Sequence, residues 1–223
     1  MVGENMLNEF KTILREAEAE IIEKKSRFIA TVRPVKSEDE ARLFVEEMKK
    51  KYWNATHNVF AYQLGERNEV QRFSDVGEPQ GTAGMPVLNV LKGEDIKNTA
   101  VVVTRYFGGT LLGTGGLVRA YGKAAKEGLL AAGIAELILY AKYEITTEYT
   151  ESGKVQYEIL QEGHILFDTL YSEKVVYVVF VRIEEIQAFE KKMTHIFRGD
   201  TPFVRKGEQY GVWEDGELSI LEG

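Results

Sequence analysis

The chain contains no cysteine, so disulfides, thiolate metal sites and cysteine nucleophiles are all excluded. Its first residues lack a basic segment followed by an apolar run, so no secretory signal is expected. No stretch approaches the roughly 20 apolar residues of a membrane-spanning helix. The three histidines have no zinc-ligand spacing, and no nucleophile elbow is present. We therefore expect a cytoplasmic protein with no membrane partner, metal or cofactor.

The charge of the chain is unevenly distributed. The formal net charge is −7 over 223 residues, which taken as a whole disfavours nucleic acid. Residues 1–134 hold 19 of the 28 Lys and Arg against 18 of the 35 Asp and Glu, a net of +1. Residues 135–223 hold the remaining 9 against 17, a net of −8. Any surface for a polyanion must therefore lie in the first part.

Apolar periodicity predicts the order of helices and strands. Apolar spacing of three and four residues favours helices over 38–52, 83–91, 117–132, 151–162 and 184–197. Extended segments are expected over 17–35, 56–64, 99–104, 136–149, 164–171, 174–182 and 201–213. The second half follows the β-α-β-β-α-β order of a ferredoxin-like domain. We place the boundary at Gly133–Glu136, which gives an α+β protein with domains 1–134 and 135–223.

The stretch from Arg105 to Gly116 is rich in glycine and precedes a predicted helix. It is not a P-loop, since Thr114 stands at the lysine position, and Val118 breaks a dinucleotide fingerprint. Glycine lets a backbone approach a ligand closely, and a helix N-terminus offers N–H groups to an anion. The glycines of this stretch are Gly108, Gly109, Gly113, Gly115 and Gly116.

Basic residues on the following helix add to this pattern. Arg119, Lys123 and Lys126 share one helical face. They predict an anion-binding surface together with Arg105 and the glycine amides, although a solvated face and tight turns explain the same residues.

The segment 74–84 is the second candidate site. Asp75 and Glu78 could hold Mg²⁺ or act as an acid–base pair, with His57 as a further acid, base or ligand. The alternative is that one carboxylate caps a helix while the other is solvated, and that His57 is structural. Thr82 is a candidate helix cap and ligand contact.

Several motifs resemble the YigZ/IMPACT family: residues 25–30, 56–62, 74–84, 101–109 and 112–122, with the signature Arg105-Tyr-Phe-Gly-Gly. The resemblance covers residues 15–134, and the tail resembles the variable C-terminal domain of bacterial members. It implies a ribosomal-protein S5 domain 2-like fold for the first domain and a ferredoxin-like second domain. The family loop commonly reads Ser-Asp-Asp-Gly-Glu-Pro, and here Val76 replaces the second aspartate, which weakens a metal or catalytic interpretation of the loop.

The resemblance also bears on function. The two domains are similar to domains IV and V of elongation factor G, which implies a link to RNA or ribosomes. The eukaryotic branch is implicated in translational control through a protein partner. Our first hypothesis is a non-enzymatic binding protein for RNA, ribosomes or a translation factor. The alternatives are a hydrolase or transferase of a phosphorylated small molecule, and a module whose acidic second domain docks a basic protein. The oligomeric state is left open.

Overall fold

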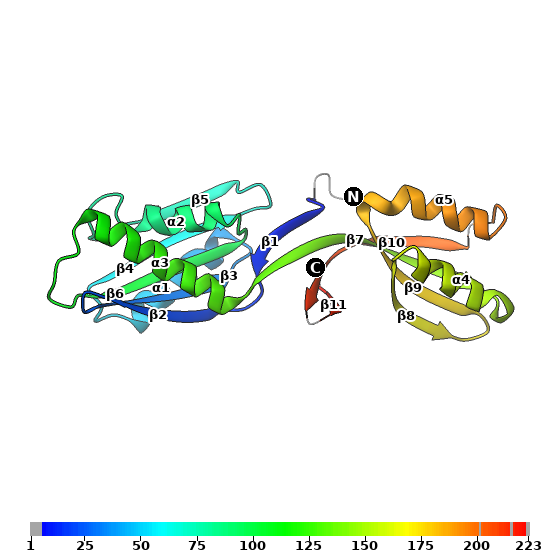
Figure 1. Ribbon diagram of the computed structural model, residues 1–223, viewed down its shortest axis with the longest axis horizontal. Coiled ribbons are helices and arrows are strands. Elements are labelled where there is room, and N and C mark those ends of the chain that lie inside the picture. The colour runs from blue at the N-terminus through cyan, green and yellow to red at the C-terminus, as the bar shows by residue number, and fades with distance from the viewer. Residues whose placement is uncertain (1–5, 201, 215, 222–223) are drawn as a thin grey trace. The chain divides into compact units, whose positions relative to one another are not determined.

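The computed structural model describes residues 6–200, 202–214 and 216–221, which divide into two compact units. One unit holds residues 10–136, and the other joins the described residues 6–9 to the part of the chain from 137 onwards (Figure 1). The two-domain α+β architecture is confirmed. Within the described ranges, no helix is long and apolar enough to cross a membrane.

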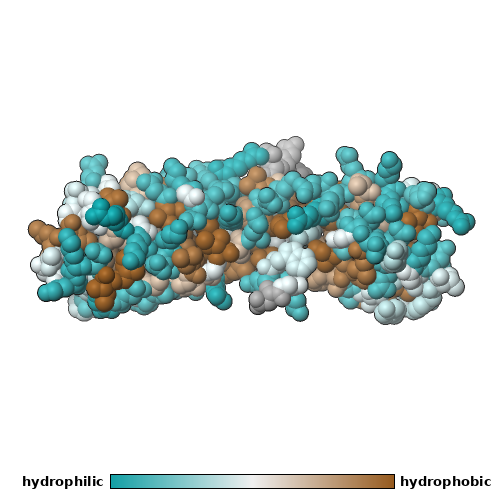
Figure 2. Space-filling view, viewed as in Figure 1, coloured by the Kyte–Doolittle hydropathy of each residue, from teal (hydrophilic) through white to brown (hydrophobic). Residues whose placement is uncertain are grey.

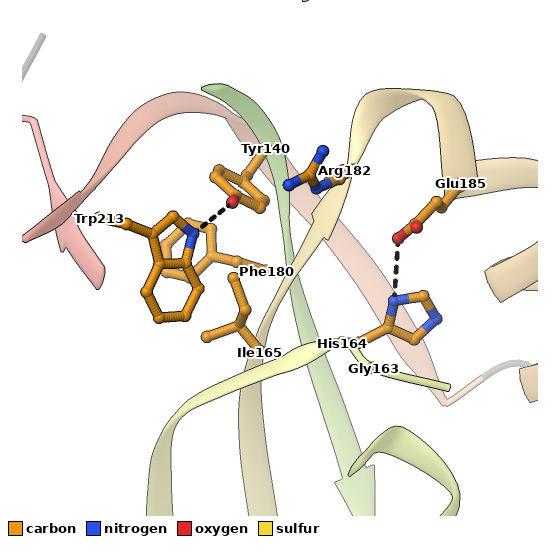
Figure 3. A pocket seen from close by; sticks show the side chains of 8 residues that line it. All are labelled: Tyr140, Gly163, His164, Ile165, Phe180, Arg182, Glu185 and Trp213. Carbon is orange, nitrogen blue, oxygen red and sulfur yellow. Dashed lines mark hydrogen bonds and ion pairs between the residues drawn. The ribbon is translucent and has the colours of Figure 1, made fainter. Parts of the chain in front are cut away.

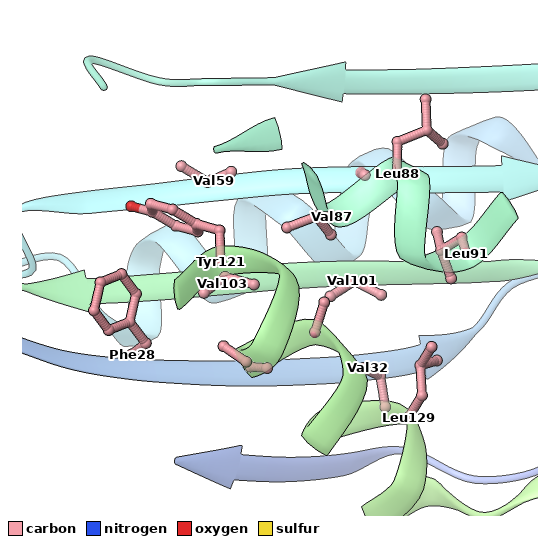
Figure 4. Packing of buried hydrophobic residues seen from close by; sticks show 14 of the residues in the cluster. Phe28, Val32, Val59, Val87, Leu88, Leu91, Val101, Val103, Tyr121 and Leu129 are labelled. Atoms are coloured by element: carbon pink, nitrogen blue, oxygen red, sulfur yellow. The ribbon is translucent and has the colours of Figure 1, made fainter. Parts of the chain in front are cut away.

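The first unit is built on a five-stranded antiparallel sheet with β6 (Thr99–Tyr106) at its centre. The order of the strands is β2-β3-β6-β4-β5. The bounds of the other four are Ala17–Glu23 for β2, Ser26–Pro34 for β3, His57–Leu64 for β4 and Val70–Ser74 for β5. Helix α1 (Glu38–Lys51) packs on one face, and α2 (Gly84–Gly93) and α3 (Thr114–Ala132) pack on the other. Val101 and Val103 face α3, as Figure 4 shows, while Ala100 and Val102 lie in the cluster with α1. The middle of the central strand, residues 100–103, is apolar because both faces of the sheet are covered.

Local signals set the start of two helices. The Ser37 hydroxyl accepts a hydrogen bond from the Glu40 N–H at 3.2 Å, as the capping pattern predicts. Helix α3 begins at Thr114 rather than at residue 117, so this expected start is wrong. Gly113 takes a φ of 73°, and the Leu117 N–H already bonds its carbonyl at 2.9 Å. Glycine reaches this conformation without strain. The helix therefore begins directly after Gly113, and its first turn includes Gly115 and Gly116.

The extended segment 17–35 forms two strands. A two-residue turn separates β2 from β3, and both of its residues, Lys24 and Lys25, have positive φ (45° and 69°). Such turns usually carry Asn-Gly, so two lysines gave no sequence signal for the turn. Three further short strands, β1 (Glu9–Ile13), β5 (Val70–Ser74) and β11 (Glu217–Ile220), also lie outside the expected elements.

The second unit confirms the β-α-β-β-α-β order. Its elements are β7 (Ile134–Thr147), α4 (Tyr149–Gln161), β8 (Ile165–Tyr171), β9 (Val175–Arg182), α5 (Ile186–Ile196) and β10 (Phe203–Glu214). A short 3-10 turn, Ile183–Glu185, precedes α5. The sheet order is β11-β10-β7-β9-β8, and its four main strands pair antiparallel. One face packs against α4 and α5 through a single apolar cluster.

Two glycines of α3 allow a test of how closely this helix packs. A Cβ at Gly128 would lie 2.9 Å from Val32 Cγ1 and 3.1 Å from Ala30 Cβ, whereas one at Gly122 would lie 3.9 Å from Val90 Cγ2. Alanine gains about 0.5–1 kcal/mol over glycine in a helix, and overpacking costs about 1–3 kcal/mol. We expect Gly122→Ala to raise the free energy of unfolding and Gly128→Ala to lower it, as measured by urea denaturation. Equal effects would contradict the close packing of α3 on β3.

Candidate functional site

One end of the sheet in the first unit gathers several polar side chains on the face covered by α3. The register places Arg105 of β6 opposite both Phe28 of β3 and His57 of β4. Ser26, two residues before Phe28 on β3, lies on the same face because side chains alternate along a strand. The segment 74–84 and the glycine loop 107–113 lie at this end of the sheet. The elements therefore bring His57, Glu78 and Arg105 together.

A buried ion pair lies at the centre of the site. The Arg105 Nη1 atom lies 2.5 Å from Glu78 Oε1, and the two side chains are only 6% and 4% exposed. The Tyr121 hydroxyl donates to the same oxygen at 2.7 Å. Burial and the Glu78 carboxylate both raise the pKa of Tyr121, so its phenol stays protonated. The Arg105 guanidinium also lies over the rings of Phe28 and Phe107.

His57 joins the edge of this cluster. Its Nδ1 lies 2.9 Å from the Val76 carbonyl oxygen, which can only accept, so Nδ1 carries a hydrogen. Its Nε2 lies 3.8 Å from Glu78 Oε1, outside hydrogen-bond distance. A Cβ at Gly77 would lie 3.1 Å from the His57 ring. The segment 74–84 is thus packed directly on the imidazole.

Asp75 is engaged with the backbone. Its carboxylate accepts hydrogen bonds from the N–H groups of Gly81, Ala83 and Gly84 at 2.8, 3.1 and 2.8 Å. It therefore caps α2, and negative charge is favourable at this end of a helix. Thr82 does not cap the helix, because its buried hydroxyl donates to the Pro79 carbonyl at 2.6 Å. Nor is Glu78 solvated, contrary to the alternative in which one carboxylate is free.

The glycine loop packs against the turn between β2 and β3. A Cβ at Gly108 would lie 2.0 Å from the Lys25 carbonyl carbon, so only glycine fits there. The Ser26 hydroxyl fixes this contact by accepting the Gly108 N–H at 3.1 Å. Gly109 has a positive φ of 81°, and Gly113 is the N-cap residue of α3. The turn that carries Lys24 and Lys25 therefore lies beside the loop, which the sequence did not indicate.

The three cations of α3 differ in their partners. Lys126 pairs with Glu94 at the end of α2 at 2.9 Å. Arg119 and Lys123 are exposed and form no ion pair with any described residue. The α3 N-terminus has no side-chain cap, so the N–H groups of its first turn are also available to a ligand. Arg105, in contrast, uses its guanidinium internally.

Exposed apolar side chains accompany these cations. Leu111 of the glycine loop is 83% exposed, and Phe107 and Val118 are also exposed. In the space-filling view, apolar patches interrupt the polar surface of this unit (Figure 2). Over the described ranges, no three carboxylate or histidine side chains cluster in a way that could hold a metal ion.

The fold and the site define a two-domain α+β protein that exposes a glycine loop and a basic helix on its first domain. Residues 24–129 match the Impact N-terminal domain, and residues 145–200 match a domain of unknown function, DUF1949. The chain belongs to the IMPACT family.

Relatives cover nearly the whole chain. The chain is 42% identical to the IMPACT family member YvyE of Bacillus subtilis (strain 168), over 97% of this chain and 95% of the relative. It is 33% identical to the IMPACT family member YigZ of Escherichia coli (strain K12), over 79% and 87%. A solved structure described as a crystal structure of an hypothetical protein aligns with a TM-score of 0.57 at 28% identity, covering 94% of this chain and all of that one.

The buried ion pair predicts a large loss of stability when its charge balance is broken. Removing one partner of a buried pair costs about 3–5 kcal/mol, since the other charge stays buried without compensation. We expect Glu78→Gln to lower the free energy of unfolding by this amount, measured by urea denaturation. Glu94→Gln is the matched control, because its pair with Lys126 is exposed and contributes about 0–1 kcal/mol. Similar losses in the two variants would contradict a structural role for Glu78.

Proposed function

We propose that this protein is a non-enzymatic binding protein of the translation machinery, whose first domain contacts RNA phosphates, as on a ribosome. The observation that carries the proposal is a set of exposed cations flanking the glycine loop. The set comprises Lys24, Lys25, Arg119 and Lys123, and none of them is paired with a described residue. We name it the basic rim. Phosphate contacts by Lys and Arg supply most of the affinity of non-specific RNA binding.

Backbone donors and exposed apolar groups strengthen this surface. The uncapped first turn of α3 presents N–H groups and the positive end of the helix dipole, both of which favour a phosphate. Phe107 and Leu111 are exposed on the same loop, and an aromatic ring at this place can stack on an unpaired base. Charge, amide donors and an aromatic ring are therefore combined within one loop and its neighbours.

The strained lysine turn points the same way. Lysine is disfavoured at positive φ, yet Lys24 and Lys25 both adopt it. Strained backbone of this kind tends to persist where function requires it. Asn-Gly would form the same turn without strain but would remove two cations. The presence of lysine at both positions is explained if their charges contact a ligand.

A hydrolase or transferase receives less support from the same geometry. Asp75 accepts three backbone N–H groups, and Glu78 is buried with Arg105 and Tyr121. Both carboxylates therefore serve the packing of the site, which favours a structural role for them over acid–base chemistry. The link to translation, and with it a cytoplasmic location, rests on the resemblance of the two domains to domains IV and V of elongation factor G.

The two cations of α3 provide a direct test. We expect the double variant Arg119→Ala/Lys123→Ala to co-sediment less with ribosomes and to bind fluorescein-labelled single-stranded RNA more weakly. The slope of log K against the logarithm of the salt concentration should become less steep by about 1.4, because two phosphate contacts are lost. Lys49→Ala/Lys50→Ala removes the same charge from α1, on the other face of the sheet, and should leave the slope unchanged. Unchanged affinity and slope in the α3 variant would rule out the proposal.

The lysine turn predicts opposite effects on stability and binding. Lys24→Asn/Lys25→Gly should relieve the strain of positive φ and raise the free energy of unfolding by about 1 kcal/mol. The same variant should bind RNA more weakly, in a titration followed by anisotropy, because two cations are lost. Lys24→Arg/Lys25→Arg keeps the charge and should bind as the natural sequence does. A stabilised variant with full affinity would remove the turn from the proposed surface.

A further inference from the structure

The second domain contains a cleft of about 160 Å³ that the proposed function does not use (Figure 3). Its aromatic side is formed by Tyr140 of β7, Phe180 of β9 and Trp213 of β10. Its polar side is formed by Arg182, His164 and Glu185. A cavity of about 150 Å³ is known to accept a benzene ring, so this cleft is large enough to admit a flat aromatic ring.

The aromatic side of the cleft is held in a fixed arrangement. The Trp213 Nε1–H donates to the Tyr140 hydroxyl at 3.0 Å, which fixes the orientation of the indole. Tyr140 and Phe180 meet edge to face at 6.3 Å and are both buried. Trp213 itself remains 47% exposed. An exposed flat ring in a fixed orientation is a platform on which another flat ring can stack.

Arg182 supplies an unpaired cation at the edge of this platform. The register places it directly opposite Tyr140, on the same face of the sheet. Among the described residues no carboxylate pairs with its half-buried guanidinium. The domain carries a net −8, and Arg182 is the cation that lines the cleft, beside the Glu185 carboxylate. Its guanidinium can bind a phosphate or a carboxylate.

The polar side can recognise the edge of a ring. His164 is 9% exposed, and its Nδ1 lies 3.4 Å from Glu185 Oε2 without a hydrogen bond of good geometry. Burial lowers the pKa of His164, so its imidazole is neutral near pH 7. The Glu185 carboxylate accepts hydrogen bonds, and a nucleobase carries N–H donors along its edge. A simple aromatic carboxylate has no such donors to offer.

We propose that this cleft binds the base of a phosphorylated nucleotide, stacked on Trp213, with Arg182 contacting the phosphate. The face of the base then stacks on the indole, the phosphate contacts the guanidinium, and the edge of the base donates to the Glu185 carboxylate. The nucleotide comes either from single-stranded RNA or as a free molecule, since the chemistry is the same. The site lies wholly within the second domain, so it stands independently of the basic rim.

Trp213 is its own reporter. The chain has two tryptophans, and Trp53 of the first domain is 82% exposed, so Trp53→Phe leaves Trp213 as the sole indole. The full chain with this change is titrated with octaadenylate, with an abasic octamer of equal charge, and with AMP, while Trp213 emission is recorded. We expect saturable quenching by octaadenylate and none by the abasic octamer. Quenching by AMP as well as by octaadenylate would show that a free nucleotide is sufficient. Quenching by octaadenylate but not by AMP would identify single-stranded RNA as the ligand.

Matched variants separate this site from other surfaces. Arg182→Ala should weaken octaadenylate binding by roughly tenfold or more, and Arg182→Gln, which keeps the stem, serves if alanine impairs folding. Lys154→Ala removes an exposed cation of α4 that pairs with no described residue, and it should change affinity by less than about twofold. One phosphate contact predicts a shallow salt slope of about −0.7. The quenching of Trp213 should persist in the double variant Arg119→Ala/Lys123→Ala, because these cations belong to the basic rim. Failure of the cleft proposal and failure of the basic-rim proposal can therefore be told apart.

The proposal is overturned by any of three results. These are no saturable quenching by octaadenylate or AMP at millimolar concentration, equal quenching by the abasic octamer, and equal loss of affinity in the Arg182 and Lys154 variants.

Discussion

The arrangement of the first domain depends on the buried contact between Arg105 and Glu78. Two charges removed from water are stable only when each is closely compensated, and here Tyr121 and the flanking aromatic rings add to the compensation, while the buried Nε of Arg105 has no hydrogen-bond partner among the described residues. The contact joins the end of β6, the segment 74–84 and helix α3 at one point. Asp75 then caps α2 from the same segment. The exposed loops around this point are therefore shaped by a charged core that solvent does not reach.

This constraint divides the polar residues of the site into two groups. Arg105, Glu78, Asp75 and Thr82 satisfy internal partners, whereas the basic rim has none among the described residues. The first group explains why a segment rich in glycine and carboxylates holds a single shape. The second group is free to meet a ligand. Residue types that suggest acid–base chemistry in a sequence can thus serve a structural purpose, and burial and partners decide between the two.

Much of the fold follows from the sequence because its signals are local. The capping pair Ser37 and Glu40, and the apolar spacing after it, determine α1 within one turn. The β-α-β-β-α-β order of the second domain was likewise predictable. The lysine turn was not, because neither residue favours positive φ. The Arg105–Glu78 contact spans 27 positions and leaves no periodic trace, so the internal role of Arg105 emerged only from the structure. The same holds for the Trp213–Tyr140 bond, across 73 positions.

The two candidate surfaces rely on different physics. The basic rim offers several separate cations and helix amides, so its affinity would come from phosphates and fall steeply with salt. The cleft of the second domain offers one cation and a fixed indole, so its affinity would come from stacking and depend little on salt. A net −8 around the cleft weakens any long polyanion but affects a single base and phosphate much less, since exposed charges are screened beyond about 8–10 Å at physiological salt. The acidic charge of the second domain therefore favours selective contact with one nucleotide over tracking along a strand.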